Sequence, residues 1–564
     1  MNILPIDKKS QVPTRVAYFS MEIMLETDIA TYAGGLGMLA GDILRSLCDK
    51  SVPAIGVTMA FNYGYTNQEV NADGSQNFIP AEWIKNDQLS KESKTVTLNI
   101  EGKDITIGCY RYDIVSASGF IVPIILLTTD YFENTDEQRY FSKYLYDHEK
   151  RVRLIQEIIL GIGGIKMLRA LGYENIQNFH MNDGHCAFLT LEVLKELNYD
   201  IDKTKSHCCF TTHTPVPAGR DIFDYDLAYG VMGDLLPWNI KELAGQDGLD
   251  MPQLAFNLSK YTNGVSRKHG EVSSNMFNAH IDYITNGVHA DTWFSPITQE
   301  VFDKYFPKFR DNITNLKYID EVDDEIILDM HKLNKKNLID HVNKYLDHKE
   351  DKGSRFDYDT LTITFARRCV AYKRPDLIFN DLKRLLRLGI GQIQIIFCGK
   401  AHPDDGEAGQ ILKRIIQYRN QFSQILSIVY LENYNPSIAK QLVAGSDIWL
   451  NNPVIPLEAS GTSGMKAAMH GTINFSIYDG WFTEGMEMEP NSSFTIGNPP
   501  ETLYPLRDDI KDANNLYTTL EEQIIPMFYR KPDEWVKKMK DSIKLGAYFN
   551  TNRVVDQYLE KAWN

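Results

Sequence analysis

Short runs of hydrophobic residues recur at regular intervals through the second half of the chain. A helix-like pattern, with apolar residues three and four positions apart, follows the first three runs at 375–389, 409–422 and 436–445. The runs themselves, which we expect to be buried strands, cover residues 361–366, 392–399, 425–433, 446–452 and 472–480. Continuous apolar runs that alternate with amphipathic helices are typical of a parallel sheet covered on both faces. The pattern therefore predicts a doubly wound domain, whose ligands bind beyond the carboxyl ends of its strands.

The first half shows a less regular version of the same alternation, with expected helices at 36–49 and about 137–171. The expected strands cover residues 15–21, 52–61, 176–183, 207–215 and 281–290. The predicted fold class is therefore α/β, with two Rossmann-like doubly wound domains that face each other across a deep cleft, a natural substrate site. The predicted division is 1–295, 296–546 and a C-terminal helix at 547–564 that packs back toward the first domain.

Composition excludes several classes of protein. The 564 residues contain 59 lysines and arginines against 75 aspartates and glutamates, and the resulting charge of −16 argues against nucleic acid and anionic membrane as partners. The seven cysteines are scattered, and no C-x-x-C pair or His/Cys cluster predicts a metal site. The start lacks the apolar core of a signal peptide, and the apolar stretches are too short to span a bilayer. We therefore expect a soluble, cytoplasmic enzyme without a metal.

The segment LEASGTSGMKAAMHGT (457–472) places a lysine at the end of a loop rich in glycine and hydroxyl groups. The loop contains Ser460, Gly461, Thr462, Ser463 and Gly464. Good helix formers follow, and a loop that leads into a helix N-terminus is an anion-binding arrangement. We expect Lys466 in the first turn of that helix, where the helix dipole disfavours a cation, so the lysine should have another task. It could condense with pyridoxal phosphate. The alternative is a surface lysine after a tight turn.

A second basic cluster lies in FARRCVAYKRPD (365–376), at the end of the first strand of the second domain. It consists of Arg367, Arg368, Lys373 and Arg374. Guanidinium and ammonium groups at the carboxyl end of a strand suit a phosphate ligand. A solvated basic loop is the alternative.

A third candidate is YAGGLGMLAGD (32–42), in which Gly34, Gly35 and Gly37 open a helix. The strand–loop–helix outline fits an anion site, although the spacing does not match G-x-G-x-x-G. The alternative interpretation is a simple packing turn.

Polar residues also follow several expected strands of the first domain. They are Asn182, Asp183, His185, His213, Asn286 and His289. Such mixed donors and acceptors suit sugar hydroxyls, although each residue could equally be a satisfied structural group. Trp293 and Tyr434 could stack on a ring, or could simply belong to the core.

Together these motifs resemble those of the α-glucan phosphorylases, the glycogen, starch and maltodextrin phosphorylases. EASGTSGMK resembles the segment that carries the pyridoxal phosphate lysine in that family. RRCVAYKRP, GGLG, HMNDGH, TTHTPV, TNGVHADTW and VYLENYNPSIA resemble its other landmarks in the expected order, from about Val16 to about Tyr558. The sequences of these motifs are closer to those of the short bacterial and archaeal enzymes than to those of the long animal and plant enzymes. The resemblance implies the GT-B fold and a reversible reaction in which phosphate releases α-glucose 1-phosphate, with retention, from the non-reducing end of an α-1,4-glucan.

The resemblance also implies roles for individual residues, with pyridoxal 5'-phosphate as the cofactor. Its phosphate would act as acid and base. Implied catalytic residues are Arg368, Lys373, His213 and Glu458. Implied cofactor-binding residues are Lys466, Thr462, Ser463, Gly464, Arg367, Tyr434 and Trp293. Implied substrate-binding residues are Gly35, Asn286, Ser460, Gly461, Asp183 and His185. Implied partners are α-1,4-glucan or maltooligosaccharide, inorganic phosphate and α-glucose 1-phosphate, and the family includes homodimers.

The chain departs from the long enzymes of the family at a few positions. Asn435 stands where they carry a basic residue, and Cys369, Val370 and Ala371 replace their Ile-His-Glu. Because the resemblance starts near Val16, we expect regulation different from the N-terminal phosphorylation switch of the animal enzymes. The rival hypotheses are a nucleotide-sugar glucan synthase of the same fold, which needs no lysine like Lys466, and an inactive glucan-binding protein.

Overall fold

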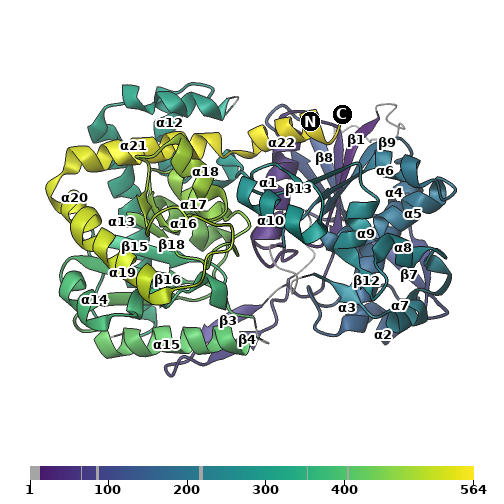
Figure 1. Cartoon of the computed structure of the whole chain (residues 1–564), viewed down its shortest axis with the longest axis horizontal. Helices are drawn as coiled ribbons and strands as arrows, with labels where there is room; N and C mark the ends of the chain where they lie inside the picture. Colours follow the sequence, from purple (N-terminus) through teal and green to yellow (C-terminus); the bar gives the residue numbers. More distant parts are fainter. Residues whose placement is uncertain are drawn as a thin grey trace.

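The computed structural model describes residues 13–64, 66–83, 88–214, 220–310, 312–351, 353–402 and 405–564, and Figure 1 shows the chain built around two separate sheets. The structure is a mixed α/β fold in which most strand pairs are parallel, and this confirms the predicted fold class at that level. Residue 215, the last of the strand expected at 207–215, lies outside the described residues. None of the helices in these segments is long and apolar enough to cross a membrane.

The sheet of the second half is parallel throughout. Its order is β17 (Ser427–Leu431), β16 (Ile393–Cys398), β15 (Leu361–Ala366), β18 (Ile448–Asn451), β19 (Ile473–Ser476) and β20 (Phe494–Thr495). All five hydrophobic runs predicted as strands form strands of this sheet. The chain moves outward from β15 first in one direction and then in the other, so the strand order reverses between β15 and β18. Ligands of doubly wound folds bind beyond the carboxyl ends of the strands at such a switch point.

The sheet of the first half has ten strands and is mixed. From one edge the order is β14 (Asp282–Tyr283), β13 (Tyr261–Gly264), β10 (Cys208–Thr211), β9 (Ile176–Asn182), β1 (Thr14–Ser20), β2 (Ala54–Met59), β8 (Ile121–Thr128), β7 (Lys103–Val115) and β5 (Ser90–Lys91), and β6 (Val96–Ile100) also pairs with β7. The strands from β14 to β8 are parallel, whereas β7 is antiparallel to β8 and to its other neighbours. The sequence pattern did not predict the antiparallel strands.

The helices agree with the predictions in most places. α1 (Gly35–Asp49), α15 (Gly406–Phe422) and α16 (Pro436–Gly445) lie where they were expected. The helix expected at 375–389 begins only at α14 (Leu382–Gly389), because the Asp381 side chain accepts from the Arg384 N–H and caps it there.

Two further predictions were wrong in part. The helix expected over 137–171 starts at Lys150 and runs to Ala170, because the residues between the short α2 (Asp136–Tyr140) and that point bond to the chain near Asn62 and Tyr63 instead. The strand expected at 281–290 is reduced to β14, since its later residues lead into α11 (Ala290–Trp293).

Successive side chains of a strand point to opposite faces of the sheet, so the first sheet has a hydrophobic core on each face. On β1, Phe19 joins the core beneath the helices of residues 150–170, and Tyr18 joins the core beneath α1. The core of the second sheet also takes in Trp293 and Phe302, from α11 and α12 (Pro296–Tyr305).

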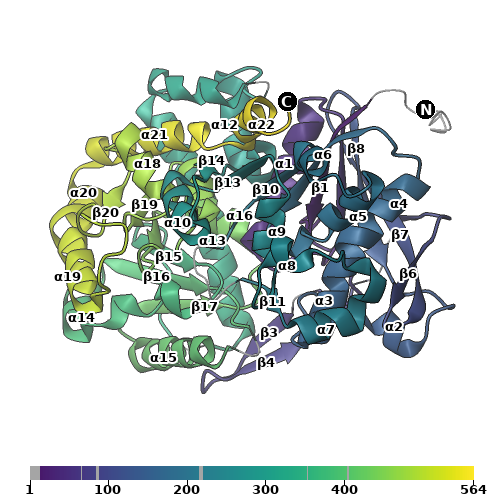
Figure 2. The ribbon, with the colours of Figure 1, turned by 45° about the vertical axis from the view of Figure 1, so that its right-hand side comes forward.

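The last helix, α22 (Thr551–Lys561), packs on the first sheet and not on the second. Figures 1 and 2 show it beside α1, and its Tyr558 lies in the same core as Tyr18. The Tyr558 hydroxyl lies 2.8 Å from Thr211 Oγ1 on β10, and the Tyr558 ring stacks on Trp563 at 4.7 Å. The chain end is therefore bound into the first half of the molecule.

A β-hairpin from the first half makes the opposite crossing. β3 (Asn67–Val70) and β4 (Gln76–Ile79) pair only with each other and lie beside α15 (Figure 1). The Val70 N–H donates to Glu432 Oε1 at 2.9 Å, and Asn420 Nδ2 donates to the Ala72 carbonyl at 2.9 Å. The two halves of the chain are therefore tied at the hairpin as well as at α22.

We predict that Trp563→Ala lowers the free energy of unfolding by about 3–5 kcal/mol, because a fully buried indole is lost and a cavity remains. Urea denaturation followed by circular dichroism measures the change. Trp238→Ala is the matched control, since Trp238 is 86% exposed and its loss should change stability by no more than about 0.5 kcal/mol. Equal effects of the two substitutions would contradict the packing role of the C-terminal segment.

Candidate active site

Lys466 lies on a short helix that follows the glycine-rich loop. α17 (Thr462–Ala468) begins after Gly461, whose φ of 88° is in the left-handed region that favours glycine. Because the helix has only seven residues, Lys466 falls in its last turn, where the dipole favours a cation. The expectation that it lies in the first turn was wrong, and the dipole argument for a special role fails with it.

The surroundings of Lys466 are a stronger indication. The side chain is 4% exposed, and its Nζ lies 3.3 Å from the centroid of the Trp293 ring and 3.7 Å from Met38 Sδ. No carboxylate of the described chain forms an ion pair with it. Burial lowers the pKa of Lys466 to about 8, against the opposing influence of Asp42. A buried amine that gives up its proton near neutral pH is a competent nucleophile.

Asp42 was missed by the sequence analysis. It lies on α1, is 1% exposed and accepts a hydrogen bond from the Trp293 indole N–H at 2.8 Å. The signal available in the sequence was an acidic residue inside the apolar stretch LAGDIL, but its partner is 251 positions away.

The basic cluster converges on Glu458, which stands in the glycine-rich loop. Arg367 Nη1 lies 2.9 Å and Lys373 Nζ 2.8 Å from Glu458 Oε2. Arg367 also bonds to the side chain of Asn451 at the end of β18 and, through Nη2, to Ser463 Oγ at 3.3 Å. The structure therefore brings the ends of β15 and β18 and the glycine-rich loop together at the switch point of the second sheet.

The charges in this cluster do not balance. Burial opposes ionisation of Glu458, but Lys373 and Arg367 more than offset it and hold the pKa of Glu458 at about 2. Burial, helped by the neighbouring Arg367 and Arg368, lowers the pKa of Lys373 to about 7 against the opposing effect of Glu458. Arg368 itself is exposed and has no ion-pair partner within the described residues. Two buried cations thus share one carboxylate, with Arg368 as a further cation near Lys373, and such an excess of positive charge suits an anionic ligand.

Arg374, the fourth member of the predicted basic cluster, serves the fold. Its guanidinium bonds to Asp509 at 2.8 Å, Asp512 at 2.7 Å and the carbonyl oxygens of Asn452 and Pro453 at 2.9 Å each. Each of its three nitrogens therefore bonds to a protein group.

The glycine-rich turn before α1 is held by Glu22, another residue that the sequence analysis missed. Glu22 Oε2 accepts from the N–H groups of Ala33 at 2.6 Å and Gly34 at 3.0 Å. Gly35 begins α1, and a Cβ added there would meet nothing within 4 Å. The start of α1 is therefore open to a ligand, and the same helix contacts Lys466 through Met38. The available signal was a glutamate directly after the first strand.

The polar ends of β9 and β10 lie together, as expected for neighbouring parallel strands. His213 Nε2 lies 2.7 Å from Asn182 Oδ1, and burial lowers the pKa of His213 to about 3, so the ring is neutral. Asp183 has a φ of 77°, which is unusual for a residue other than glycine and marks a constrained backbone. His185 turns instead toward Asp221, with Nε2 at 3.2 Å from Oδ2.

The remaining predicted residues are less engaged. Asn286 is buried, and its carbonyl accepts from Arg553 Nη2 at 2.9 Å. Tyr434 is half-buried and packs against the cores of the second sheet. His289 caps α11 and bonds to Asp49 Oδ2 at 2.8 Å, which is a structural role.

The first half of the chain holds the glycine-rich loop from the other side. Ser266 Oγ, just before α10 (Arg267–Phe277), donates to the Ala459 carbonyl at 2.6 Å. The Glu458 N–H donates to Asp479 Oδ2 at 2.9 Å, and Lys268 Nζ lies 3.7 Å from the other oxygen of Asp479. Ser460 Oγ is buried without a partner in the described chain. The loop is therefore fixed by both halves, with one hydroxyl left to a ligand.

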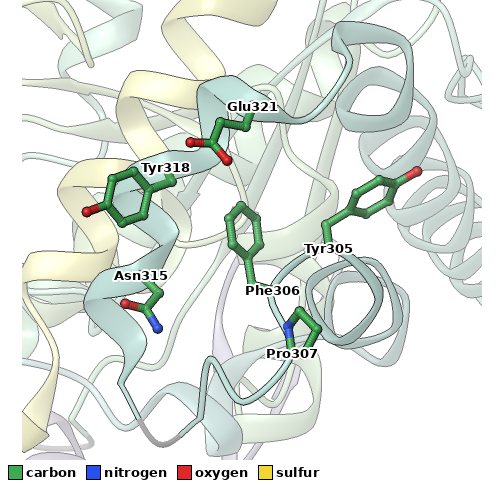
Figure 3. Close-up of a pocket in the computed structure, with 6 residues that line it drawn as sticks. All are labelled: Tyr305, Phe306, Pro307, Asn315, Tyr318 and Glu321. Atoms are coloured by element: carbon green, nitrogen blue, oxygen red, sulfur yellow. The ribbon is translucent and has the colours of Figure 1, made fainter.

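A cavity of about 450 Å³ lies elsewhere, between α12 and the turn of residues 313–321. Figure 3 shows its lining, which consists of Tyr305, Phe306, Pro307, Asn315, Tyr318 and Glu321. It includes none of the predicted site residues.

The fold and the site define an α/β enzyme with a buried lysine amine and a cluster of cationic side chains at the switch point of its second sheet. A sequence profile described as carbohydrate phosphorylase matches residues 18–107 and 231–527. The chain is 33% identical to the maltodextrin phosphorylase of Thermococcus litoralis, over 97% of this chain and 70% of that protein. It is also 33% identical to the glycogen phosphorylase of Aquifex aeolicus, over 97% and 86%, and to an uncharacterized protein of Methanocaldococcus jannaschii, over 97% and 99%. The chain belongs to the carbohydrate phosphorylase family, which confirms the resemblance inferred from the motifs.

We predict that anion affinity at the cluster falls as pH rises above about 7, because Lys373 there loses its charge. Sulfate is the suitable probe, since its own charge is constant, and calorimetry from about pH 6 to about pH 9 should show affinity falling by up to about tenfold per pH unit. Asp479, whose pKa burial raises to about 7, titrates in the same range. Lys373→Arg leaves Asp479 in place but carries a side chain that stays charged throughout this range, so the sulfate affinity of this variant should vary much less with pH. A pH profile of Lys373→Arg that matches the wild type would contradict the role of Lys373.

Proposed function

We propose that the protein catalyses the reversible phosphorolysis of an α-1,4-glucan. Inorganic phosphate would attack the terminal glucose at the non-reducing end and release α-glucose 1-phosphate with retention of configuration. The observation that carries the proposal is the excess of positive charge around Glu458, on the loop that leads directly to the buried amine of Lys466. The maltodextrin and glycogen phosphorylases among the relatives support a glucan as substrate.

The residues around Lys466 fit pyridoxal 5'-phosphate. The amine has no carboxylate neutralising it within the described chain, an aromatic face lies against it, and buried Arg367 keeps an unpartnered Nε. In this proposal Lys466 carries the cofactor and Trp293 borders it. Its phosphate would be held by Thr462, Ser463, Gly464, Arg367 and Tyr434. When bound, the cofactor would supply a phosphate whose second pKa of about 6 suits proton donation and acceptance near neutral pH.

The substrate phosphate would be bound by Arg368, Lys373 and the N–H of Gly35 at the start of α1. Two phosphates side by side repel each other, and cations placed around them offset that repulsion. The low pKa of Lys373 supports this role, because a bound anion would restore the charge that burial suppresses. Glu458, held ionised by its two partners, keeps both cations in position.

The terminal glucose would be held by a ring of polar groups. We assign this ring to Glu458, Ser460, Gly461, His213, Asn286, Asp183 and His185. The unpartnered hydroxyl of Ser460 and the neutral ring of His213 support hydrogen bonding to sugar hydroxyls. The positive charge that develops on the sugar would be stabilised by the adjacent phosphate. Water must be excluded, since it would hydrolyse the bond instead.

For the whole chain we propose the GT-B arrangement, with domains at 1–295 and 296–546 and the segment 547–564 returning to the first domain. The switch in strand order of the second sheet and the packing of α22 on the first sheet support it. The site would then lie in the cleft between the domains. A homodimer remains an expectation from the family, and the seven buried free cysteines fit a reducing, cytoplasmic location.

We predict that Lys466→Ala loses both cofactor and activity, because no other amine takes its place. Borohydride reduction of the wild-type protein followed by peptide mass analysis should find one pyridoxyl group, attached to Lys466. Lys440→Met is the control, because replacing this neighbouring lysine should leave the cofactor attached to Lys466. An active Lys466→Ala enzyme without cofactor would refute the assignment.

The reaction itself is tested by glucose 1-phosphate release from maltooligosaccharides of increasing length, with and without phosphate. We expect release only with phosphate, and Arg368→Ala should raise the KM for phosphate by about tenfold or more, because a charge-assisted contact is lost. A requirement for a sugar nucleotide would favour the rival glucan synthase, and an unchanged KM in Arg368→Ala would refute its role.

A further inference from the structure

The turn between β19 and α18 (Trp481–Met488) holds the glycine-rich loop by its backbone. Asp479 Oδ2 accepts from the Glu458 N–H at 2.9 Å, and the Trp481 N–H donates to the Ser460 carbonyl at 3.1 Å. These two bonds lie on either side of the residue between Glu458 and Ser460. The turn and the loop therefore move as one unit, and the backbone of both loop residues follows the position of Asp479.

The carboxylate of Asp479 is buried, and its counter-charge comes from the other half of the chain. The side chain is 1% exposed, and Lys268 Nζ, which belongs to α10, lies 3.7 Å from Oδ1. Burial raises the pKa of Asp479 to about 7 with help from Glu458, and Lys268 opposes the rise. No other cation of the described chain forms an ion pair with Asp479. A buried carboxylate that loses its counter-charge takes up a proton and becomes a weaker acceptor.

Lys268 does not serve the helix that carries it. It lies in the first turn of α10, where the helix dipole disfavours a cation, and its side chain is only 11% exposed. Besides reaching Asp479, its Nζ donates to the Tyr478 carbonyl at 3.3 Å. Glu271, one turn further along α10, also favours the charged form of Lys268 but is itself exposed. The buried end of the lysine is therefore directed at the turn behind the loop.

We propose that Lys268 is a positioning residue for the terminal glucose, which fixes the loop through Asp479 so that Glu458 and Ser460 meet the sugar hydroxyls. The proposal rests on the proposed function, because it takes these loop residues as glucose ligands. Lys268 itself touches no substrate atom. A displacement of about 1 Å in such contacts is costly even when the changed residue is remote. The first half of the chain thus completes the part of the glucose site that the second half carries.

Lys268→Met tests the role, because it keeps an unbranched side chain and removes the charge. With phosphate saturating, we expect the KM for a maltooligosaccharide to rise about tenfold while kcat changes less, since binding contacts are weakened. Lys268→Arg keeps the charge and should bring the KM back to within about threefold of wild type. Arg267→Met is the matched control, because the neighbouring Arg267 crosses the same interface to the exposed Glu487. Its KM should stay within about twofold of wild type.

Hydrogen exchange of the loop gives a readout that does not depend on activity. In a peptide that covers residues 457–464, mass spectrometry should find exchange about tenfold faster in Lys268→Met, because the Glu458 N–H loses a fixed acceptor. Lys268→Arg and Arg267→Met should exchange like wild type. Asp479→Asn should raise the KM as Lys268→Met does, and the double variant should be no worse than either single variant, as expected for partners in one contact.

A KM and a loop exchange that are the same in Lys268→Met and Arg267→Met would overturn the positioning role and leave phosphorolysis intact. Additive effects of Lys268→Met and Asp479→Asn would overturn the route through Asp479. If Lys268→Met fails to fold, Lys268→Gln replaces it, since the amide keeps a donor without the charge, and a wild-type KM there would overturn the role. A wild-type protein that releases no glucose 1-phosphate with phosphate would refute the proposed function, and the glucose role with it.

Discussion

The contact of Glu458 with both Arg367 and Lys373 determines how the parts of the site are held together. Arg367 follows β15, and Glu458 stands in the loop beyond β18, so one carboxylate joins the two strands between which the sheet changes direction. Removing Glu458 would leave two buried cations without their counter-charge, which is far costlier than losing a surface ion pair. The same contact leaves positive charge in excess, so the stability of the site and the anion binding proposed for it depend on one group.

The glycine-rich loop is also shaped from the first half of the chain. Ser266 bonds to Ala459, and Asp479 connects the loop backbone to Lys268. Met38 of α1 also contacts Lys466 from the same half. The lysine, the loop and the basic cluster therefore have fixed positions only when both halves of the chain are in place.

The sequence correctly predicted the strands and helices that depend on residues close together along the chain. The strands of the second sheet are buried on both faces, so each is a continuous apolar run, and α16 was predicted at its observed bounds, 436–445. The strands β7 and β8 were missed because they form a hairpin and do not follow the pattern of an apolar run and then a helix. The break before Lys150 was missed because it depends on bonds to the distant Asn62 and Tyr63. Asp42 and Glu22 were missed for the same reason: their partners are set by the fold, not by spacing. The motifs located Lys466, Arg367, Lys373 and Glu458, whose roles stay predictions.

The hairpin of β3 and β4 affects how the two sheets can move. It crosses from the first half to the second at the bottom edge of the molecule in Figures 1 and 2, and α22 makes the reverse crossing at the top edge. At these two places a whole element of one half lies on the other half, whereas the contacts between them, such as Ser266 with Ala459 and Thr285 with Glu484, are single hydrogen bonds. A body held most firmly at two separated points turns most easily about the line that joins them. Any rotation of one sheet relative to the other would then occur about the axis that runs from the hairpin to α22. A sliding motion of the two sheets past each other would have to break one of these attachments.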